Sequence, residues 1–235
     1  MTLAQFLDMA KASNVSGVLL EVEVNNNIQF IRRYSCFFQS VYSEKKNPTR
    51  SSILVPDARV QHAPYLAKRG LGVVDAVSSA LTKAGYDKET KQQVFIQSDD
   101  SAVLSAFMKF KAFKRVLSIE IEISGASKPS LDDIKKVADG VRIHRSSVAQ
   151  ITGYFMTSFT DTVGSLQAAN LTVFIGVLKN EFMNLGFDFF ADPTVEIVTY
   201  SSAVLADGLV TDYPATAASY FSEYPSDSLT GSNDH

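Results

Sequence analysis

Polar side chains in this sequence stand directly after apolar runs that have the length of buried strands. In chain order they are Glu21, Glu23, Gln97, Ser98, Lys179, Glu181 and Asp212. The ends of parallel strands meet at one face of an α/β domain, where binding residues gather. Lys179 and Glu181 can act there as a pair facing a phosphate group, or form an ordinary ion pair at a loop. Gln97 and Ser98 can hydrogen-bond a ligand or lead into a helix, and Asp212 can be catalytic or a turn residue.

The composition excludes several other kinds of site. The sequence has one cysteine, Cys36, so an internal disulfide framework or a cysteine-rich zinc centre cannot form. The three histidines are far apart, and no helix-borne His-x-x-x-His zinc signature occurs. Among them, His144 has no acidic or histidine neighbour in the sequence and is predicted to be structural. The net charge of −3 argues against a nucleic-acid partner, because such proteins normally carry a basic patch.

The elements that must position these residues follow a regular alternation. Strand-like runs are expected at 17–23, 93–98, 115–121, 140–143, 171–177 and 207–211, with amphipathic helices between them. About six such units indicate a parallel sheet with covering helices. A doubly wound sheet and a (β/α)₈ barrel both fit this pattern. No Gly-x-Gly-x-x-Gly follows a strand, which weakens the dinucleotide-binding version, but six units are two short of a closed barrel.

Residues 24–61 break the alternation. They show no strand–helix rhythm, and they hold six Lys or Arg residues against two acids. Three interpretations are open: a basic loop for an acidic partner, a surface insertion that loop-closure entropy tolerates, or a translated intron. The third is favoured, because a long structureless loop is uncommon inside a compact domain. In addition, Val24 is encoded by a codon beginning with GT and Gln61 can be encoded by one ending in AG, as intron boundaries require.

We therefore predict a domain formed by residues 1–23 and 62–221, an irregular basic insertion at 24–61, and a disordered polar tail at 222–235. Removing the insertion joins Glu23 directly to His62.

An open sheet of six strands has two unpaired edges, which are an aggregation hazard. A further hypothesis is therefore that the chain does not fold stably.

Five stretches of the joined sequence resemble one family in content and in order. They are 17–23 continued by 62–67, then 94–100, 177–182, 188–194 and 207–217. Together they resemble the plant glycerophosphodiester phosphodiesterase-like proteins, which are cell-surface proteins with tandem barrel domains, often held by a GPI anchor. The Asp-Gly-x-x-Thr-Asp-x-Pro ending is moderately specific by itself, and the ordered set is highly specific. The resemblance covers nearly all of residues 1–27 and 62–225.

The resemblance implies a (β/α)₈ barrel, truncated so that the chain carries strands three to eight. It implies a phosphoric diester hydrolase that converts a small-molecule glycerophosphodiester to an alcohol and glycerol 3-phosphate with a divalent cation, Ca²⁺ or Mg²⁺. Such chemistry needs carboxylates for the cation, a histidine pair for proton transfer and a basic group for the charge on phosphorus. Glu21 matches the family's metal-binding Glu, although it can also be a solvent-facing acid. Glu23 stands where the family has a Lys, and an acid there repels phosphate.

The chain departs from active members in other places. Their His-Arg-Gly strand, their Glu-x-Asp strand and their second catalytic histidine do not occur in this sequence. We therefore expect no useful turnover from this chain alone, and the alternative is a non-catalytic module that organises wall polymers or binds phosphorylated ligands. For the full-length parent the resemblance implies the extracellular face of the plasma membrane or the cell wall. The membrane would be reached only through a lipid anchor not present in this chain, in which no signal peptide and no spanning segment is visible.

Overall fold

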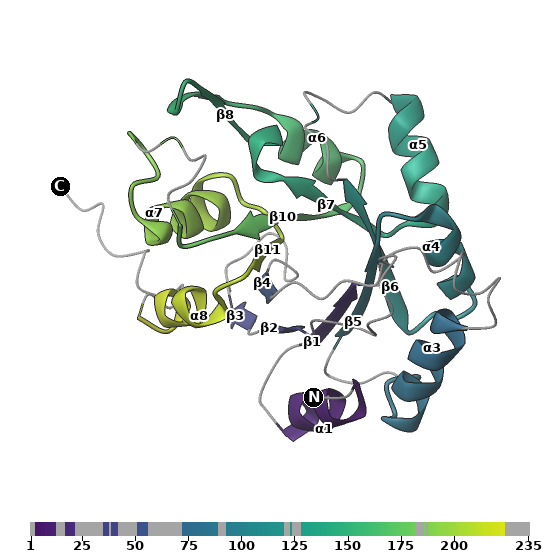
Figure 1. The fold of residues 1–235 in the computed structure, drawn as a ribbon. Coiled ribbons are helices and arrows are strands. Elements are labelled where there is room, and N and C mark those ends of the chain that lie inside the picture. Colours follow the sequence, from purple (N-terminus) through teal and green to yellow (C-terminus); the bar gives the residue numbers. More distant parts are fainter. Residues whose placement is uncertain are drawn as a thin grey trace.

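The computed structural model describes residues 3–12, 17–21, 35–37, 39–41, 51–55, 72–88, 93–119, 123, 128–181, 186 and 188–223 (Figure 1). The helices are α1 (Leu3–Ala12), α3 (Val73–Lys83), α4 (Ser101–Phe107), α5 (Lys128–Val137), η1 (Arg145–Ser147), α6 (Thr162–Ala168), α7 (Pro193–Val198), η2 (Thr199–Ala203) and α8 (Pro214–Glu223). The strands are β1 (Gly17–Glu21), β2 (Ser35–Phe37), β3 (Gln39–Val41), β4 (Ser51–Val55), β5 (Gln93–Ser98), β6 (Phe113–Ile119), β7 (Gly140–His144), β8 (Ala149–Thr152), β9 (Phe155–Phe159), β10 (Thr172–Leu178) and β11 (Gly208–Thr211).

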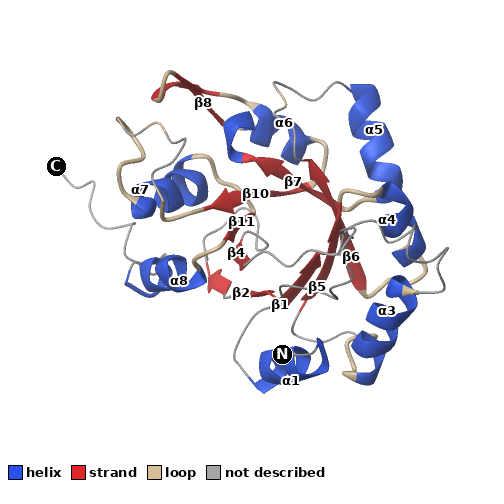
Figure 2. Cartoon of the chain, viewed as in Figure 1, coloured by secondary structure: helices blue, strands red, loops and turns tan. Residues whose placement is uncertain are grey.

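The main sheet confirms the predicted fold class. Its strand order is β2-β1-β5-β6-β7-β10-β11-β4-β3, and the neighbours from β1 to β11 are all parallel. Each of these six strands is followed along the chain by a helix, from α3 after β1 to α8 after β11. Figure 2 shows the curved sheet in the middle and the helices around its outer side. The chain is therefore an α/β protein with six strand–helix units of a barrel, because short right-handed crossovers wrap helices around a twisted parallel sheet.

The segment from residue 24 to residue 61 contributes three short strands, although its sequence predicts no regular element. β2 pairs with β1, β4 pairs with β11, and β3 pairs with β4. Strands of three to five residues are too short to show an alternating pattern, so their formation depends on long-range pairing. The rest of the segment, and residues 224–235 of the predicted tail, lie outside the described residues. The proposed domain boundaries and the intron hypothesis stay predictions.

The buried apolar residues form two clusters, and one of them lies against the N-terminal helices. Phe6 and Leu7 of α1 pack with Val18 of β1 and Val94 of β5, together with residues of α3 and α4. A second, larger cluster joins β6, β7, β10 and β11 to α6, α7 and α8. Leu19 and Phe95 belong to this second cluster, whereas their strand neighbours belong to the first. This alternation follows from the two-residue period of strands, and it gives β1 and β5 two buried faces.

Turn and cap residues mark one end of each of three helices, α3, α4 and α7. The Asp100 side chain accepts a hydrogen bond from the Ala102 amide at 2.7 Å, so it caps α4. Asp192 caps α7 in the same way, with Pro193 as the first helical residue. Gly85 has a left-handed conformation after α3, with φ of +75°, as is common for a glycine that follows a helix.

Two local features differ from the sequence prediction. Ser130 and Asp133 have the spacing of a capping box, which predicts a helix that begins after Ser130, but α5 already begins at Lys128 and Ser130 lies in its first turn. The β8–β9 hairpin between β7 and α6 was not predicted. Gly153 and Tyr154 both have positive φ at its turn, as a two-residue hairpin turn requires. The sequence Gly-Tyr gives little warning of this turn, because a non-glycine residue seldom adopts the conformation.

Candidate functional site

The candidate site residues stand at the carboxyl ends of parallel strands, as predicted. Glu21 is the last residue of β1 and pairs with Gln97 of β5. The side chain of Glu21 and the whole of Glu23 lie outside the described residues. On the other side of the sheet, Lys179 directly follows β10 and Asp212 directly follows β11. The structure therefore divides the predicted residues into two groups, one after β1 and β5 and one after β10 and β11.

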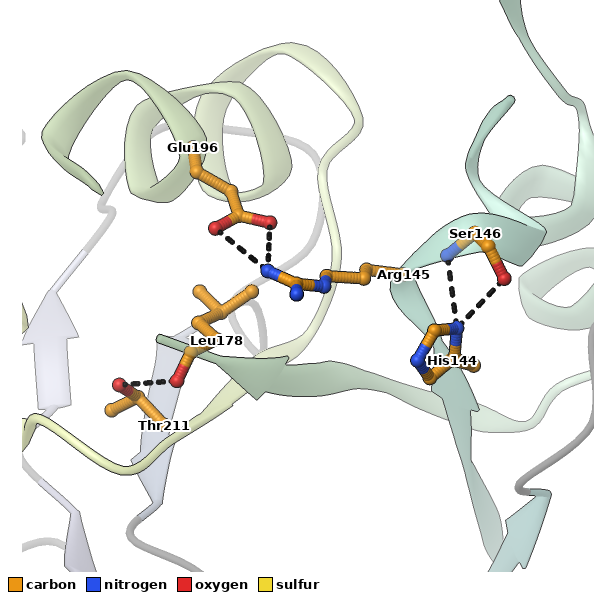
Figure 3. Close-up of polar contacts among 6 residues, drawn as sticks. All are labelled: His144, Arg145, Ser146, Leu178, Glu196 and Thr211. Atoms are coloured by element: carbon orange, nitrogen blue, oxygen red, sulfur yellow. Dashed lines mark hydrogen bonds and ion pairs between the residues drawn. The ribbon is translucent and has the colours of Figure 1, made fainter. Parts of the chain in front are cut away.

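The loops after β10 and β11 are held together by polar contacts. The Lys179 Nζ and Asp212 Oδ2 atoms are 3.8 Å apart, and the Lys179 side chain is 50% exposed. The Thr211 hydroxyl donates to the Leu178 carbonyl at 3.2 Å (Figure 3). The Asp212 amide donates to the same carbonyl at 3.1 Å. Lys179 thus forms its ion pair with Asp212 across two strand ends, while its side chain stays half exposed to solvent.

Glu181 is tied to the same loop. The Tyr213 hydroxyl donates a hydrogen bond to the Glu181 Oε1 atom, and this bond lowers the pKa of Glu181 and raises the pKa of Tyr213. The neighbouring Asn180 amide donates to the Thr216 hydroxyl at 2.9 Å. Three members of this group, Asn180, Tyr213 and Thr216, were missed by the sequence analysis. The only signal for them is that they lie within the stretches that carry the family resemblance.

Gln97 and Ser98 are both fully buried at the end of β5. The Ser98 hydroxyl accepts a hydrogen bond from the Asp100 amide at 3.1 Å. This contact supports the interpretation of Ser98 as a residue that leads into α4. Gln97 pairs with Val116 of β6 in the sheet register. A role of Gln97 and Ser98 in ligand binding stays a prediction.

The end of β7 carries His144, for which the sequence analysis predicted a structural role. The His144 Nδ1 atom lies 2.7 Å from the Ser146 hydroxyl and accepts the Ser146 amide at 3.3 Å (Figure 3). Because a backbone amide can only donate, the neutral imidazole carries its proton on Nε2. His144 therefore caps the short helix η1, which agrees with the structural role expected for it.

Arg145 and Glu196 form a buried ion pair. The Arg145 Nη1 atom lies 3.2 Å and 3.4 Å from the two carboxylate oxygens of Glu196. The two side chains are 12% and 1% exposed. Burial raises the pKa of Glu196 and the charge of Arg145 opposes that rise, with burial the larger effect. This pair joins the end of β7 to α7 across the face where the candidate site lies.

A second arginine lies buried within the sheet. The Arg142 side chain of β7 is 1% exposed. Its Nε and Nη2 atoms donate to the Ser118 hydroxyl of β6 at 3.0 Å and 2.5 Å. Ser118 and Arg142 are directly paired in the sheet register. Strand pairing therefore places this charged side chain within the sheet, two residues before His144 on β7.

A divalent cation such as Ca²⁺ or Mg²⁺ is held in proteins by several oxygen ligands. Among these residues, no group of three or more His, Cys, Asp or Glu side chains is arranged to hold a metal ion. Asp212 is occupied by Lys179, and Glu181 by Tyr213. The Glu21 side chain lies outside the described residues, so the metal-binding role of Glu21 stays a prediction. None of the helices in the described part of the chain has the length and the apolar character needed to span a membrane.

Curated relatives from Arabidopsis thaliana match this chain over most of its length. Glycerophosphodiester phosphodiesterase GDPDL7 is 40% identical over 227 residues, which are 96% of this chain and 25% of the relative. GDPDL6 is 40% identical over 220 residues, 93% of this chain and 24% of the relative. Protein Suppressor of NPR1-1 Constitutive 4 is 37% identical over 178 residues, 75% of this chain and 16% of that protein. No family model matches the chain.

Two solved structures are more distant. A phosphodiesterase from Oleispira antarctica, in complex with the product sn-glycerol-3-phosphate, has a TM-score of 0.46 at 11% identity and covers 94% of this chain and 90% of its own. A glycerophosphodiester phosphodiesterase from Thermotoga maritima has a TM-score of 0.40 at 14% identity, with 93% and 90% covered. At this level of similarity, neither structure assigns a site or an activity to this chain.

The parallel sheet, its surrounding helices and the polar residues at its strand ends define a protein of the α/β-barrel class. Within that class, the chain belongs to the plant glycerophosphodiester phosphodiesterase-like family, which confirms the resemblance found in the sequence. It spans about a quarter of the length of the curated relatives that it matches. The tandem arrangement and the GPI anchor stay predictions.

Proposed function

We propose that this chain supplies one face of a binding site for a small-molecule glycerophosphodiester. The observation that carries the proposal is the ion pair between Lys179, which follows β10, and Asp212, which follows β11. Lys179 is held by Asp212 but remains 50% exposed, so its ammonium group can bind a phosphate oxygen. The contacts of Thr211 and Tyr213 keep the two loops in fixed positions. A preformed cation at the strand ends is what recognition of a phosphodiester requires.

The reaction proposed for the whole protein is hydrolysis of the diester to an alcohol and glycerol 3-phosphate. Its support is the name shared by most of the relatives and the barrel-type fold. A divalent cation, Ca²⁺ or Mg²⁺, would polarise the phosphoryl group when bound. Glu21 is the proposed ligand from this chain, and further carboxylates must come from outside the described residues.

For the 235-residue chain alone we propose binding without useful turnover. The histidine pair and the two further metal acids of the family motif are missing from the sequence, and Glu23 replaces the family's Lys. Without a paired acid and base, the leaving alkoxide has no positioned proton donor. The chain by itself therefore supplies ligand contacts and lacks the groups that transfer protons.

The test is calorimetric titration of the purified chain with sn-glycerol 3-phosphate, with and without Ca²⁺. Lys179→Gln is expected to weaken binding about three- to tenfold, the range for one partly exposed charge-assisted contact. The matched control is Lys136→Gln, which removes an exposed lysine that is also paired with an acid, Asp133, but lies on α5. Equal affinity of the two variants would contradict a role for Lys179.

Turnover is tested separately with glycerophosphocholine and Ca²⁺. No release of glycerol 3-phosphate is expected from the chain. Measurable release that scales with the protein concentration would overturn the proposed inactivity while leaving the proposed binding site intact.

A second candidate function is a non-catalytic module that organises wall polymers at the cell surface. The acid Glu23 in place of the family's Lys favours it, since an acid there opposes phosphate binding. We propose the extracellular face of the plasma membrane or the cell wall as the location of the full-length parent, with a lipid anchor outside this chain. The two functions are distinguished by whether a full-length relative binds Ca²⁺ and hydrolyses a diester.

A further inference from the structure

Both ends of the six-stranded parallel run are covered by strands from a single segment of the chain. β2 lies antiparallel to β1, with Val18 opposite Cys36. β4 lies parallel to β11, with Leu209 beside Leu54. The hairpin partner β3 then covers the far side of β4. In Figure 1 these three short strands lie between β1 and β11, where the two ends of the run approach one another.

This arrangement removes a specific hazard of the sheet. Without the segment, β1 and β11 would both be edge strands with a row of unpaired amide and carbonyl groups. Both are also strongly apolar: Val18, Leu19 and Leu20 of β1 are buried, as are Leu209 and Val210 of β11. An apolar unpaired edge is a template for pairing with a second copy of the chain. With the segment present, the outermost strands are β2 and β3, which have only three residues each.

We propose that the strands β2, β3 and β4 together act as a closing segment on which the stability and the monomeric state of this chain depend. The segment takes the two edge positions that six strand–helix units leave open. It is therefore an integral part of the folded chain, and a dispensable surface insertion would leave both edges uncovered. This proposal is independent of the proposed ligand and of any turnover.

The first test uses the single cysteine as a probe of register in the full chain. Opposed residues of an antiparallel pair are close enough for a disulfide, so Val18→Cys is expected to form a bond with Cys36 on mild oxidation. Leu20→Cys is the matched control, because Leu20 is buried in the same cluster but is displaced by two residues along β1. Peptide mapping should show at least about tenfold more 18–36 disulfide than 20–36 disulfide, since a separation beyond about 7 Å prevents bridging.

The second test needs no disulfide and begins with the unaltered chain. Hydrogen exchange should show amide protection in β11 and β1 within about tenfold of that in the central strands β6 and β7. Leu54→Pro, which removes an amide from β4, should reduce protection in β11 at least about tenfold, whereas Leu54→Val should not. Unprotected β1 and β11 amides in the unaltered chain would overturn the proposal.

Deletion of residues 24–61, which joins Glu23 to His62, gives the complementary result. The shortened chain is expected to self-associate in light scattering and to lose its cooperative thermal transition. If it remains monomeric with an unchanged midpoint, the segment is dispensable and the proposal is wrong. Equal cross-linking of the two cysteine variants in the first test would overturn it as well.

Discussion

Arg145 and Glu196 are 51 residues apart in the sequence, and their side chains form a buried ion pair of 3.2 Å (Figure 3). Arg145 begins the short helix after β7, and Glu196 lies in the first turn of α7. The pair therefore joins the carboxyl end of one strand to the helix that follows another.

Removal of one partner of this pair should be costly. Arg145→Met leaves the Glu196 carboxylate buried without a counter-charge, which costs about 3–5 kcal/mol in comparable buried pairs. The double variant Arg145→Met/Glu196→Leu should lose less, because no charge remains buried. Urea unfolding of the two variants measures the difference. A double variant that is less stable than Arg145→Met would contradict this account.

The same pair predicts a pH dependence with a definite sign. The folded-state pKa of Glu196 is above its ordinary value of 4.5, so the folded chain binds the proton more tightly than the unfolded chain. The stability that this protonation contributes is present below pH 4.5 and is lost as pH rises through the folded-state pKa. Arg145→Met removes the charge that opposes the rise, so its destabilisation should be larger at pH 7 than at pH 4. Adding Glu196→Gln to that variant should abolish this difference in urea unfolding.

Asp139 provides a contrast between two ion pairs of similar length. It accepts from the Arg115 amide and from two atoms of the Arg115 guanidinium, at 2.9–3.1 Å, and Arg115 is mostly buried. Asp139→Ala should lower the free energy of unfolding by about 1–3 kcal/mol, because it leaves these donors unsatisfied. Asp133→Ala breaks the 2.7 Å pair with Lys136, which is fully solvated, and should cause no measurable change. Thermal unfolding of both variants measures the two losses of unfolding free energy. Equal losses would refute the distinction.

Two glycines with the same close contact should respond in opposite directions. An added Cβ at Gly140 would lie 2.6 Å from the backbone oxygen of Thr172, which the sheet holds in place, so Gly140→Ala should cost about 1–3 kcal/mol. At Gly164 the 2.6 Å contact is with a side-chain oxygen of Asp161, which can rotate away. Gly164→Ala should therefore stabilise α6 by about 0.5–1 kcal/mol. Calorimetric melting temperatures that fall for both variants would contradict the prediction for Gly164.

The contact between Tyr213 and Glu181 can be tested without any ligand. Tyr213→Phe removes the hydrogen bond that lowers the pKa of Glu181, so the carboxyl group should titrate at a higher pH in NMR. Asn180→Ala is the control, because Asn180 lies in the same loop but donates to Thr216. A carboxyl titration that is unchanged in the tyrosine variant would show that Tyr213 does not bond Glu181 in solution.

The local order of this protein can be derived from the sequence. The six strand–helix units and the caps at Asp100 and Asp192 follow from hydrophobic period and from side chains that bond to nearby amides. The grouping of Lys179 and Asp212 was also predictable in outline, because parallel strands bring their carboxyl ends to one face. In each of these cases the determining interactions lie within a few residues, or follow from the strand direction alone.

The pairing of residues far apart was decided only by the tertiary structure. No local pattern indicates that Arg145 meets Glu196, or that Ser118 receives the buried Arg142 side chain. The same is true of the three short strands between residues 35 and 55, whose sequence has no strand rhythm. β2 pairs with β1, β4 pairs with β11, and β3 pairs with β4. The physical reason is that a buried charge and an open sheet edge are satisfied by whichever group the folded chain brings near, and chain topology decides which group that is.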